Sequence, residues 1–182
     1  MFDFSTVTSH RASRQEAADD ISANHLLNEC VECAFNFNDP FHVKALMVLE
    51  LVFQQNPEWM APYLNRFCKP LQEVRHHSAM RSMARICMFL TAHHTKVAGE
   101  KFLSDVQFNK ITEVCFLWLI EDQKVAVKVY ALRSLYDAGK IYNWIYPDLQ
   151  AILERDFAGG SPGYKAAAKE ILRKINRSTS LL

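Results

Sequence analysis

The first residues with a potential for chemistry are Cys30 and Cys33, which stand in a Cys-x-x-Cys arrangement. On a helix this spacing places two thiols on one face. A redox pair would stand at a helix N-terminus after a strand, and a zinc site would need a second pair of ligands at matching spacing. Neither context is present, so we expect the two cysteines to pack between helices. The chain has five cysteines, an odd number set in apolar patterns, which favours reduced thiols over a disulfide framework.

Two histidine pairs, His76-His77 and His93-His94, could suggest a metal site. A separation of 17 residues at about 1.5 Å per helical residue places the pairs roughly 25 Å apart. Adjacent histidines also point about 100° apart on a helix, so each pair is a poor chelate. We predict helix-end histidines and no metal site.

The turn GGSPGYK, residues 159–165, brings together a serine, a lysine and three glycines. Its spacing matches neither the phosphate-binding P-loop nor the nucleophile elbow. Ser161 is instead predicted to cap a helix whose first residue is Pro162. The turn loosely resembles the serine-rich loop of lyases of the fumarase and adenylosuccinate lyase type, through Ser161, Pro162 and Lys165. That family needs longer bundle helices and a much longer chain, so an all-helical lyase is a remote alternative. We assign no catalytic residue and no cofactor, although a solenoid could assemble a catalytic site from separate repeats.

These residues are positioned by helices. In residues 121–139 a stripe of apolar or small side chains follows helical spacing: Val127, Tyr130, Ala131, Ser134, Leu135 and Ala138. No alternating run bounded by hairpin turns appears, and the first glycine is Gly99, so we predict an all-α fold.

The same pattern recurs at residues 41, 80, 127 and 164. A helical segment precedes each copy, at 24–37, 58–71, 102–120 and 140–155, and a further helix is expected at 13–22. For the first copy we prefer the register that begins at Phe41, because a shift by two residues would bury Glu50. A helix pair cannot bury both its faces alone, and stacked pairs share a continuous core. The sequence therefore predicts a right-handed α-solenoid of about four helix pairs.

The turn and second helix resemble those of HEAT repeats, and the resemblance covers roughly residues 24–176. Asp122, Val127, Lys128, Ala131 and Leu135 match the HEAT pattern best. The resemblance implies a scaffold whose second helices line a concave face. We expect a flexible segment at 1–12, a single repeat domain at 13–176 and a frayed tail at 177–182.

Basic residues recur in or beside one slot of the repeat, and the resemblance places them on the concave face. They are Arg81, Arg85, Lys128, Lys165 and Lys169. A positive stripe in a groove suits an acidic protein or peptide, or a phosphate backbone. The alternative is structural, because the basic residue of a HEAT repeat commonly bonds to the Asp of a turn. The tryptophans Trp59, Trp118 and Trp144 are predicted to lie in the core.

Charge is unevenly distributed, with 3 Lys/Arg against 9 Asp/Glu in residues 1–60 and 18 against 11 in the rest. Such polarity can attract an acidic partner or favour head-to-tail association, including a homodimer. No segment has the length and apolarity of a signal peptide or a membrane span, so we expect a cytoplasmic protein. The leading hypothesis is a non-enzymatic binding scaffold. A nucleic-acid-binding protein, built like the HEAT-like DNA-alkylation glycosylases, is the alternative, disfavoured by a net charge of only +1.

Overall fold

The computed structural model describes residues 2–97 and 102–179, and within these ranges every regular element is a helix. The prediction of an all-α fold is therefore confirmed. The chain divides into two compact units, residues 1–89 and 90–182. No helix in the described ranges is both long enough and apolar enough to cross a membrane.

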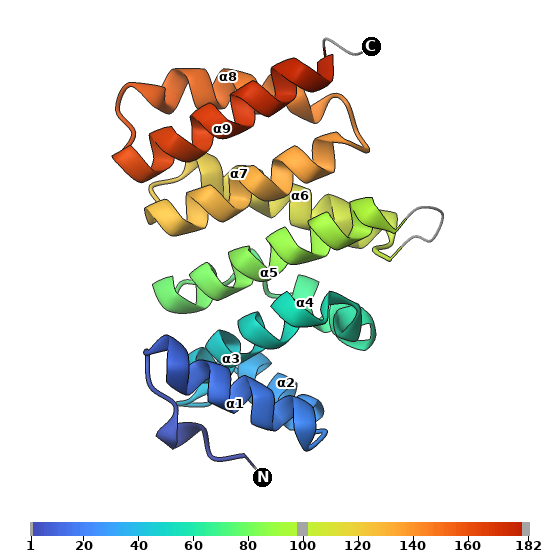
Figure 1. Cartoon of the computed structure of the whole chain (residues 1–182), viewed down its shortest axis with the longest axis vertical. Helices are drawn as coiled ribbons and strands as arrows, with labels where there is room; N and C mark the ends of the chain where they lie inside the picture. Colours follow the sequence, from blue (N-terminus) through green and yellow to red (C-terminus); the bar gives the residue numbers. More distant parts are fainter. Residues whose placement is uncertain (1, 98–101, 180–182) are drawn as a thin grey trace. The chain divides into compact units, whose positions relative to one another are not determined.

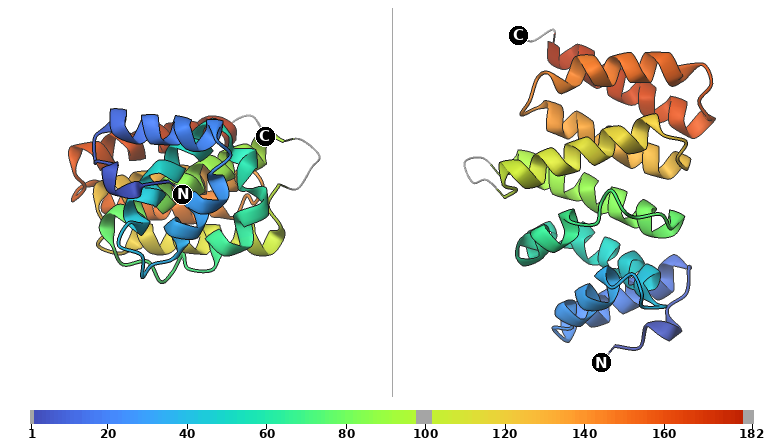
Figure 2. Two further views of the ribbon diagram at one scale, coloured as in Figure 1. Left: turned by 90° about the horizontal axis from the view of Figure 1, so that it is seen from below. Right: turned by 180° about the vertical axis from the view of Figure 1, so that it is seen from behind.

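The second unit contains two antiparallel helix pairs, α6 (Asp105–Ile120) with α7 (Val125–Gly139) and α8 (Ile145–Phe157) with α9 (Pro162–Thr179). Helix α7 contacts all three of the others. Figures 1 and 2 show α7 and α9 in one layer, with α6 and α8 in a second layer behind them. The predicted stripe of α7 points into this core, because Val127, Ala131 and Leu135 are at most 1% exposed.

The first unit is built around α3 (His42–Gln55), which contacts α1 (Arg11–Ala23), α2 (Leu27–Phe35) and a 3-10 helix, η2 (Pro57–Tyr63). Helix α3 needs a wide apolar surface for these neighbours. It has eight buried residues, seven of them apolar. The eighth is Glu50, so the prediction of a register that keeps Glu50 out of the core is wrong. The short helix α4 (Leu64–Cys68) follows η2.

The segment 58–71, predicted as one helix, is divided between η2 and α4 because Pro62 lacks the amide hydrogen that a continuous α-helix requires. Residues 1–12, expected to be flexible, include the 3-10 helix η1 (Phe4–Thr6) and the first residues of α1. Phe4 and Val7 are buried there. At the other end α9 continues to Thr179, and residues 180–182 of the predicted frayed tail lie outside the described ranges.

Helix α5 (His77–Lys96) includes residues of both units. Its first residue is His77, and His93 and His94 lie in its last turn, which confirms the prediction of helix-end histidines. The Nδ1 atom of His94 accepts a hydrogen bond from the Leu103 amide. The two histidine pairs therefore belong to the ends of one helix.

Local sequence signals explain where the helices of the second unit begin and end. Ser104 and Gln107 form a capping box at the start of α6. The Ser161 hydroxyl accepts a hydrogen bond from the Tyr164 amide at 3.3 Å, which confirms the predicted cap of α9. Helix α7 ends at Gly139, where the Tyr146 ring packs so closely that a Cβ atom would overlap it. Glycine at this position lets the α7–α8 turn close tightly.

Of the three tryptophans predicted to lie in the core, only Trp118 is buried. Trp59 is 38% exposed and Trp144 is 57% exposed, so these two predictions are wrong. Trp59 lies in the 3-10 helix η2 and not in the α-helix that was expected at 58–71. Trp144 lies in the turn before α8 and stacks on Phe116 at 6.2 Å between ring centroids.

Candidate functional site

Two of the predicted binding residues, Arg81 and Arg85, lie on α5 and face inward to a buried carboxylate. Glu50 on α3 is 0% exposed, and its Oε2 atom lies 3.2 Å from Arg81 Nη2. Arg85 Nη1 forms an ion pair with Glu50 Oε1, and Ser82 Oγ donates to Oε2 at 2.6 Å. Both guanidinium groups are thereby held by the protein itself. We name Arg14, Glu50, Ser82, Arg81 and Arg85 the Glu50 cluster.

Arg14 on α1 is the third cation of the Glu50 cluster. Its side chain is 12% exposed, and its Nη1 atom lies 3.9 Å from Glu50 Oε1. Burial lowers the pKa of Arg14, and the Glu50 carboxylate counteracts that shift. Among the described residues neither Nε nor Nη1 of Arg14 finds a hydrogen-bond acceptor. Three cations thus share one buried carboxylate, which ties together α1, α3 and α5.

Lys128, the third predicted residue, lies half-buried in the first turn of α7. It lines a cleft of about 730 Å³ between the α6–α7 turn and the α8–α9 turn. The pKa of Asp156 in this cleft is lowered, first by its hydrogen bond with Arg155 and to a smaller degree by the charge of Lys128. In the part of the chain that the structure describes, Lys128 forms no ion pair with Asp122. The bond to a turn Asp, expected from the HEAT resemblance, is therefore not formed at this position.

The last two predicted residues, Lys165 and Lys169, lie on α9 and belong to a longer series. Arg173 and Arg177 continue it, so that four cations recur every fourth residue. Four helical residues rise about 6 Å and turn about 40° past one full turn, so neighbouring cations of the series lie near each other while the series winds slowly round the helix. Lys169, Arg173 and Arg177 are exposed, and Lys165 is half-buried. We name these four residues the α9 ridge.

Within the described residues no member of the α9 ridge has an acidic partner. The single acidic residue of α9, Glu170, is engaged elsewhere. Lys174 Nζ lies 2.6 Å from Glu170 Oε1, and Arg133 Nη2 lies 3.4 Å from Glu170 Oε2. These partners lower the pKa of Glu170, with the Lys174 hydrogen bond the largest cause. The carboxylate therefore stays ionised and occupied, and the charge of the ridge is not neutralised.

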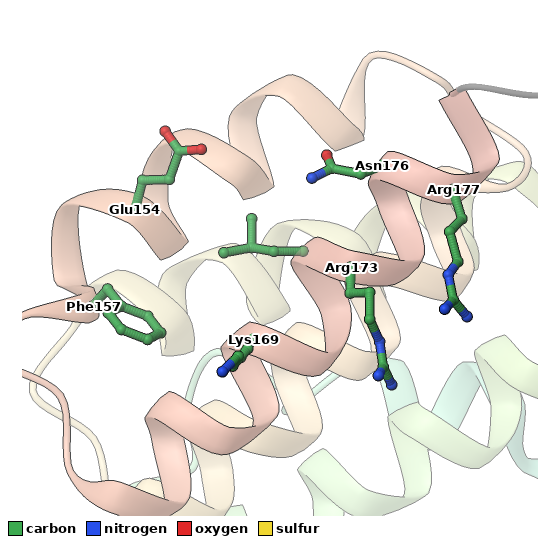
Figure 3. Close-up of a pocket in the computed structure, with 7 residues that line it drawn as sticks. Glu154, Phe157, Lys169, Arg173, Asn176 and Arg177 are labelled. Atoms are coloured by element: carbon green, nitrogen blue, oxygen red, sulfur yellow. The ribbon is translucent and has the colours of Figure 1, made fainter.

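The ridge borders an open groove of about 1160 Å³ between α8 and α9. We name it the α8–α9 groove, and its lining residues are Glu154, Phe157, Lys169, Leu172, Arg173, Asn176 and Arg177. Figure 3 shows the cationic side chains on α9, with Glu154 and Phe157 on α8. Phe157 and Leu172 are half-buried, so part of each side chain is accessible for apolar contact with a ligand. The groove thus combines an apolar surface with a cationic border.

The other groups with a potential for chemistry lack a reactive arrangement. Cys30 is buried and Cys33 half-buried, and all five cysteines are free thiols. Burial and the nearby Asp39 raise the pKa of Cys33 to about 12, which keeps it a thiol at neutral pH. Among the described residues, no three His, Cys, Asp or Glu side chains gather as metal ligands would.

No protein family, curated protein or solved structure matches this chain.

The reasoning from sequence missed Arg173 and Arg177, because it followed the basic slot of the repeat rather than the whole length of the last helix. The spacing from Lys165 to Arg177 was a sufficient signal for the ridge. It also missed Arg14 as a partner of Glu50. A lone glutamate within the apolar run ALMVLELVF pointed to a buried carboxylate in need of cations.

Proposed function

We propose that the protein is a non-enzymatic binding module that holds an acidic protein segment against the α9 ridge, in the α8–α9 groove. The observation that carries this proposal is the absence of an acidic partner for four cations spaced every fourth residue, among the described residues. Lys169 lines the groove, and Lys165 lies four residues before it on the ridge. Lys128 and the arginines of the Glu50 cluster do not belong to this surface.

Charge favours an acidic partner. Four cations at a spacing of about 6 Å repel one another, and carboxylates placed opposite them would relieve this repulsion. Such pairing would act mainly on the association rate and on specificity, and salt would weaken it. A helix with acidic residues at every fourth position would match the ridge charge for charge.

The apolar part of the groove favours a protein over a nucleic acid. Phe157 and Leu172 line the groove and can receive an aliphatic side chain, which a phosphate backbone does not offer. The groove has one aromatic side chain, Phe157, and single-stranded nucleic acids are bound through aromatic side chains that stack on successive bases.

We infer that the helix pairs are HEAT-like repeats of a short α-solenoid. Support comes from the second unit, where α7 packs against α9 as the second helices of neighbouring repeats would. The cytoplasm is the proposed location, since five free thiols suit a reducing compartment.

Fluorescence anisotropy with a labelled acidic peptide tests the function. The probe is a helical peptide with glutamates at every fourth position and one leucine between them, and a DNA single strand of equal charge serves for comparison. We expect the peptide to bind the native chain, and the Lys169→Glu/Arg173→Glu variant to lose at least tenfold in affinity.

The matched control is Lys69→Glu/Lys124→Glu, which makes the same change in net charge at two exposed lysines outside the groove. It should bind the peptide almost as the native chain does. Equal losses in both variants would reduce the effect to net charge and refute the groove. Tighter binding of the DNA strand than of the peptide would show that the groove is a nucleic-acid-binding site.

A further inference from the structure

The chain itself carries an acidic helix that matches the α9 ridge. On α1, Glu16, Asp19 and Asp20 are all exposed and follow the spacing of one helix face. Glu16 and Asp20 are four residues apart, as Lys169 and Arg173 are, so both pairs span about 6 Å along a helix. The two surfaces thus have the same spacing and opposite charge.

Within the described residues, the hydrogen-bond partners of the acidic side chains of α1 are neutral. Asp19 accepts a hydrogen bond from the neutral amide of Gln15, and Asp20 accepts one from Asn24. Among the described residues none of the three forms an ion pair. The acidic face of α1 therefore has charge available for a partner.

The basic residues of α1 do not cancel this charge. Arg14 turns inward to the Glu50 cluster, and its side chain is 12% exposed. Arg11 lies at the first position of α1, more than a turn before Glu16. The exposed Ala23 beyond the acidic residues is small, so a facing helix can approach closely.

On the basis of the function proposed above, we propose that one occupant of the α8–α9 groove is helix α1 of a second copy of this chain. Glu16 and Asp20 of one copy would face Lys169 and Arg173 of the other. This contact joins two different surfaces, so it is heterologous, and successive copies would form an open chain or a ring. The acidic face of α1 would then compete with any other acidic partner for the groove.

Sedimentation velocity over a range of protein concentrations tests the contact. At about 20 mM salt, where the Debye length exceeds 20 Å, the sedimentation coefficient should rise with concentration. At about 1 M salt, where the Debye length is near 3 Å, this rise should disappear. A native chain that stays monomeric at low salt over the whole range would overturn the proposal.

Two charge-reversed variants make the test specific. Lys169→Glu/Arg173→Glu and Glu16→Lys/Asp20→Lys should each remain monomeric, because each then presents like charges on both surfaces. Mixed in equal amounts, the two variants should associate again, since the reversed surface of each complements the reversed surface of the other. If the native chain associates but the mixture does not, association uses another surface and the proposal is wrong.

The peptide experiment keeps this inference separate from the proposed function. Binding of the acidic peptide by a chain that never self-associates would overturn the second-copy contact and leave the groove function intact. If the chain neither binds the acidic peptide nor self-associates, both the proposed function and the second-copy contact are wrong. Circular dichroism and thermal melting of each variant verify that the altered residues, which are exposed, leave the fold unchanged.

Discussion

The Oε2 atom of Glu50 lies 3.2 Å from Nη2 of Arg81, and the Glu50 side chain has no exposed surface. An isolated carboxylate would be very costly to bury, so the three surrounding arginines are what makes this position tolerable. The same contact shows that Arg81, predicted to bind a partner, is paired with a carboxylate of this chain. Its guanidinium neutralises a charge inside its own unit.

Replacing Glu50 with glutamine should destabilise the first unit strongly. The change leaves Arg14, Arg81 and Arg85 close together without a counter-charge, and breaking a buried ion pair typically costs about 3–5 kcal/mol. The free energy of unfolding from urea titration measures the loss.

The matched control is Glu32→Gln, which removes the carboxylate of an exposed ion pair with Arg66. Exposed pairs contribute at most about 1 kcal/mol, so this change should be small. Equal losses for the two substitutions would contradict the central role of the Glu50 cluster.

Replacing Gly139 with alanine should destabilise the second unit by about 1–3 kcal/mol, because the added methyl group overlaps the Tyr146 ring. In a Tyr146→Ala background the same substitution should cost much less. Thermal melting of the four proteins of this double-mutant cycle measures the coupling. Gly159→Ala, where a Cβ atom meets nothing within 4 Å, should be harmless, and a loss there as large as at Gly139 would refute the steric account.

Stability should fall in alkaline solution because of Tyr146 and Tyr164. Burial is the main cause that raises the pKa of each from 10.0 to about 12. A phenol whose pKa is higher in the folded state favours folding fully below about pH 10, and this contribution is lost as the pH rises towards 12. Urea titrations at pH 8, 10 and 11 measure this decline.

Two substitutions separate the tyrosines. The Tyr164 hydroxyl has no hydrogen-bond partner among the described residues, so Tyr164→Phe should keep or raise stability at pH 8 and reduce the alkaline decline. Tyr146 donates to the Tyr136 carbonyl at 3.3 Å, so Tyr146→Phe should cost about 1 kcal/mol at pH 8. A marked loss of stability at pH 8 for Tyr164→Phe would reveal a partner of its hydroxyl and contradict this account.

Helical periodicity predicted most of the fold. The segments expected at 102–120, 127 onwards and 164 onwards correspond to α6, α7 and α9, because each has a continuous apolar stripe and polar turns on both sides. The prediction of one helix at 58–71 was wrong. The apolar pattern continues through Pro62, but proline interrupts the α-helical hydrogen bonds. The spacing of apolar residues predicts which side chains can be buried. It does not predict whether the backbone forms an α-helix or a 3-10 helix.

The candidate site was only partly predictable. The exposure of Lys169 could be predicted, because helical periodicity places this residue on the polar side of its helix. The roles of Arg81 and Arg85 depend on Glu50, which is over thirty residues earlier in the chain, and no local pattern records that contact. Whether a basic side chain is exposed or forms an ion pair inside the protein depends on the tertiary structure.

NMR spectroscopy of the isotope-labelled chain, titrated with the acidic peptide, tests the central claim most directly. The account predicts amide shift changes concentrated on residues 165–177 of α9 and around Phe157, and their absence in Lys169→Glu/Arg173→Glu. Shift changes centred on Arg81 and Arg85, with α9 unaffected, would contradict this account. They would show that the peptide binds at the Glu50 cluster and not in the α8–α9 groove.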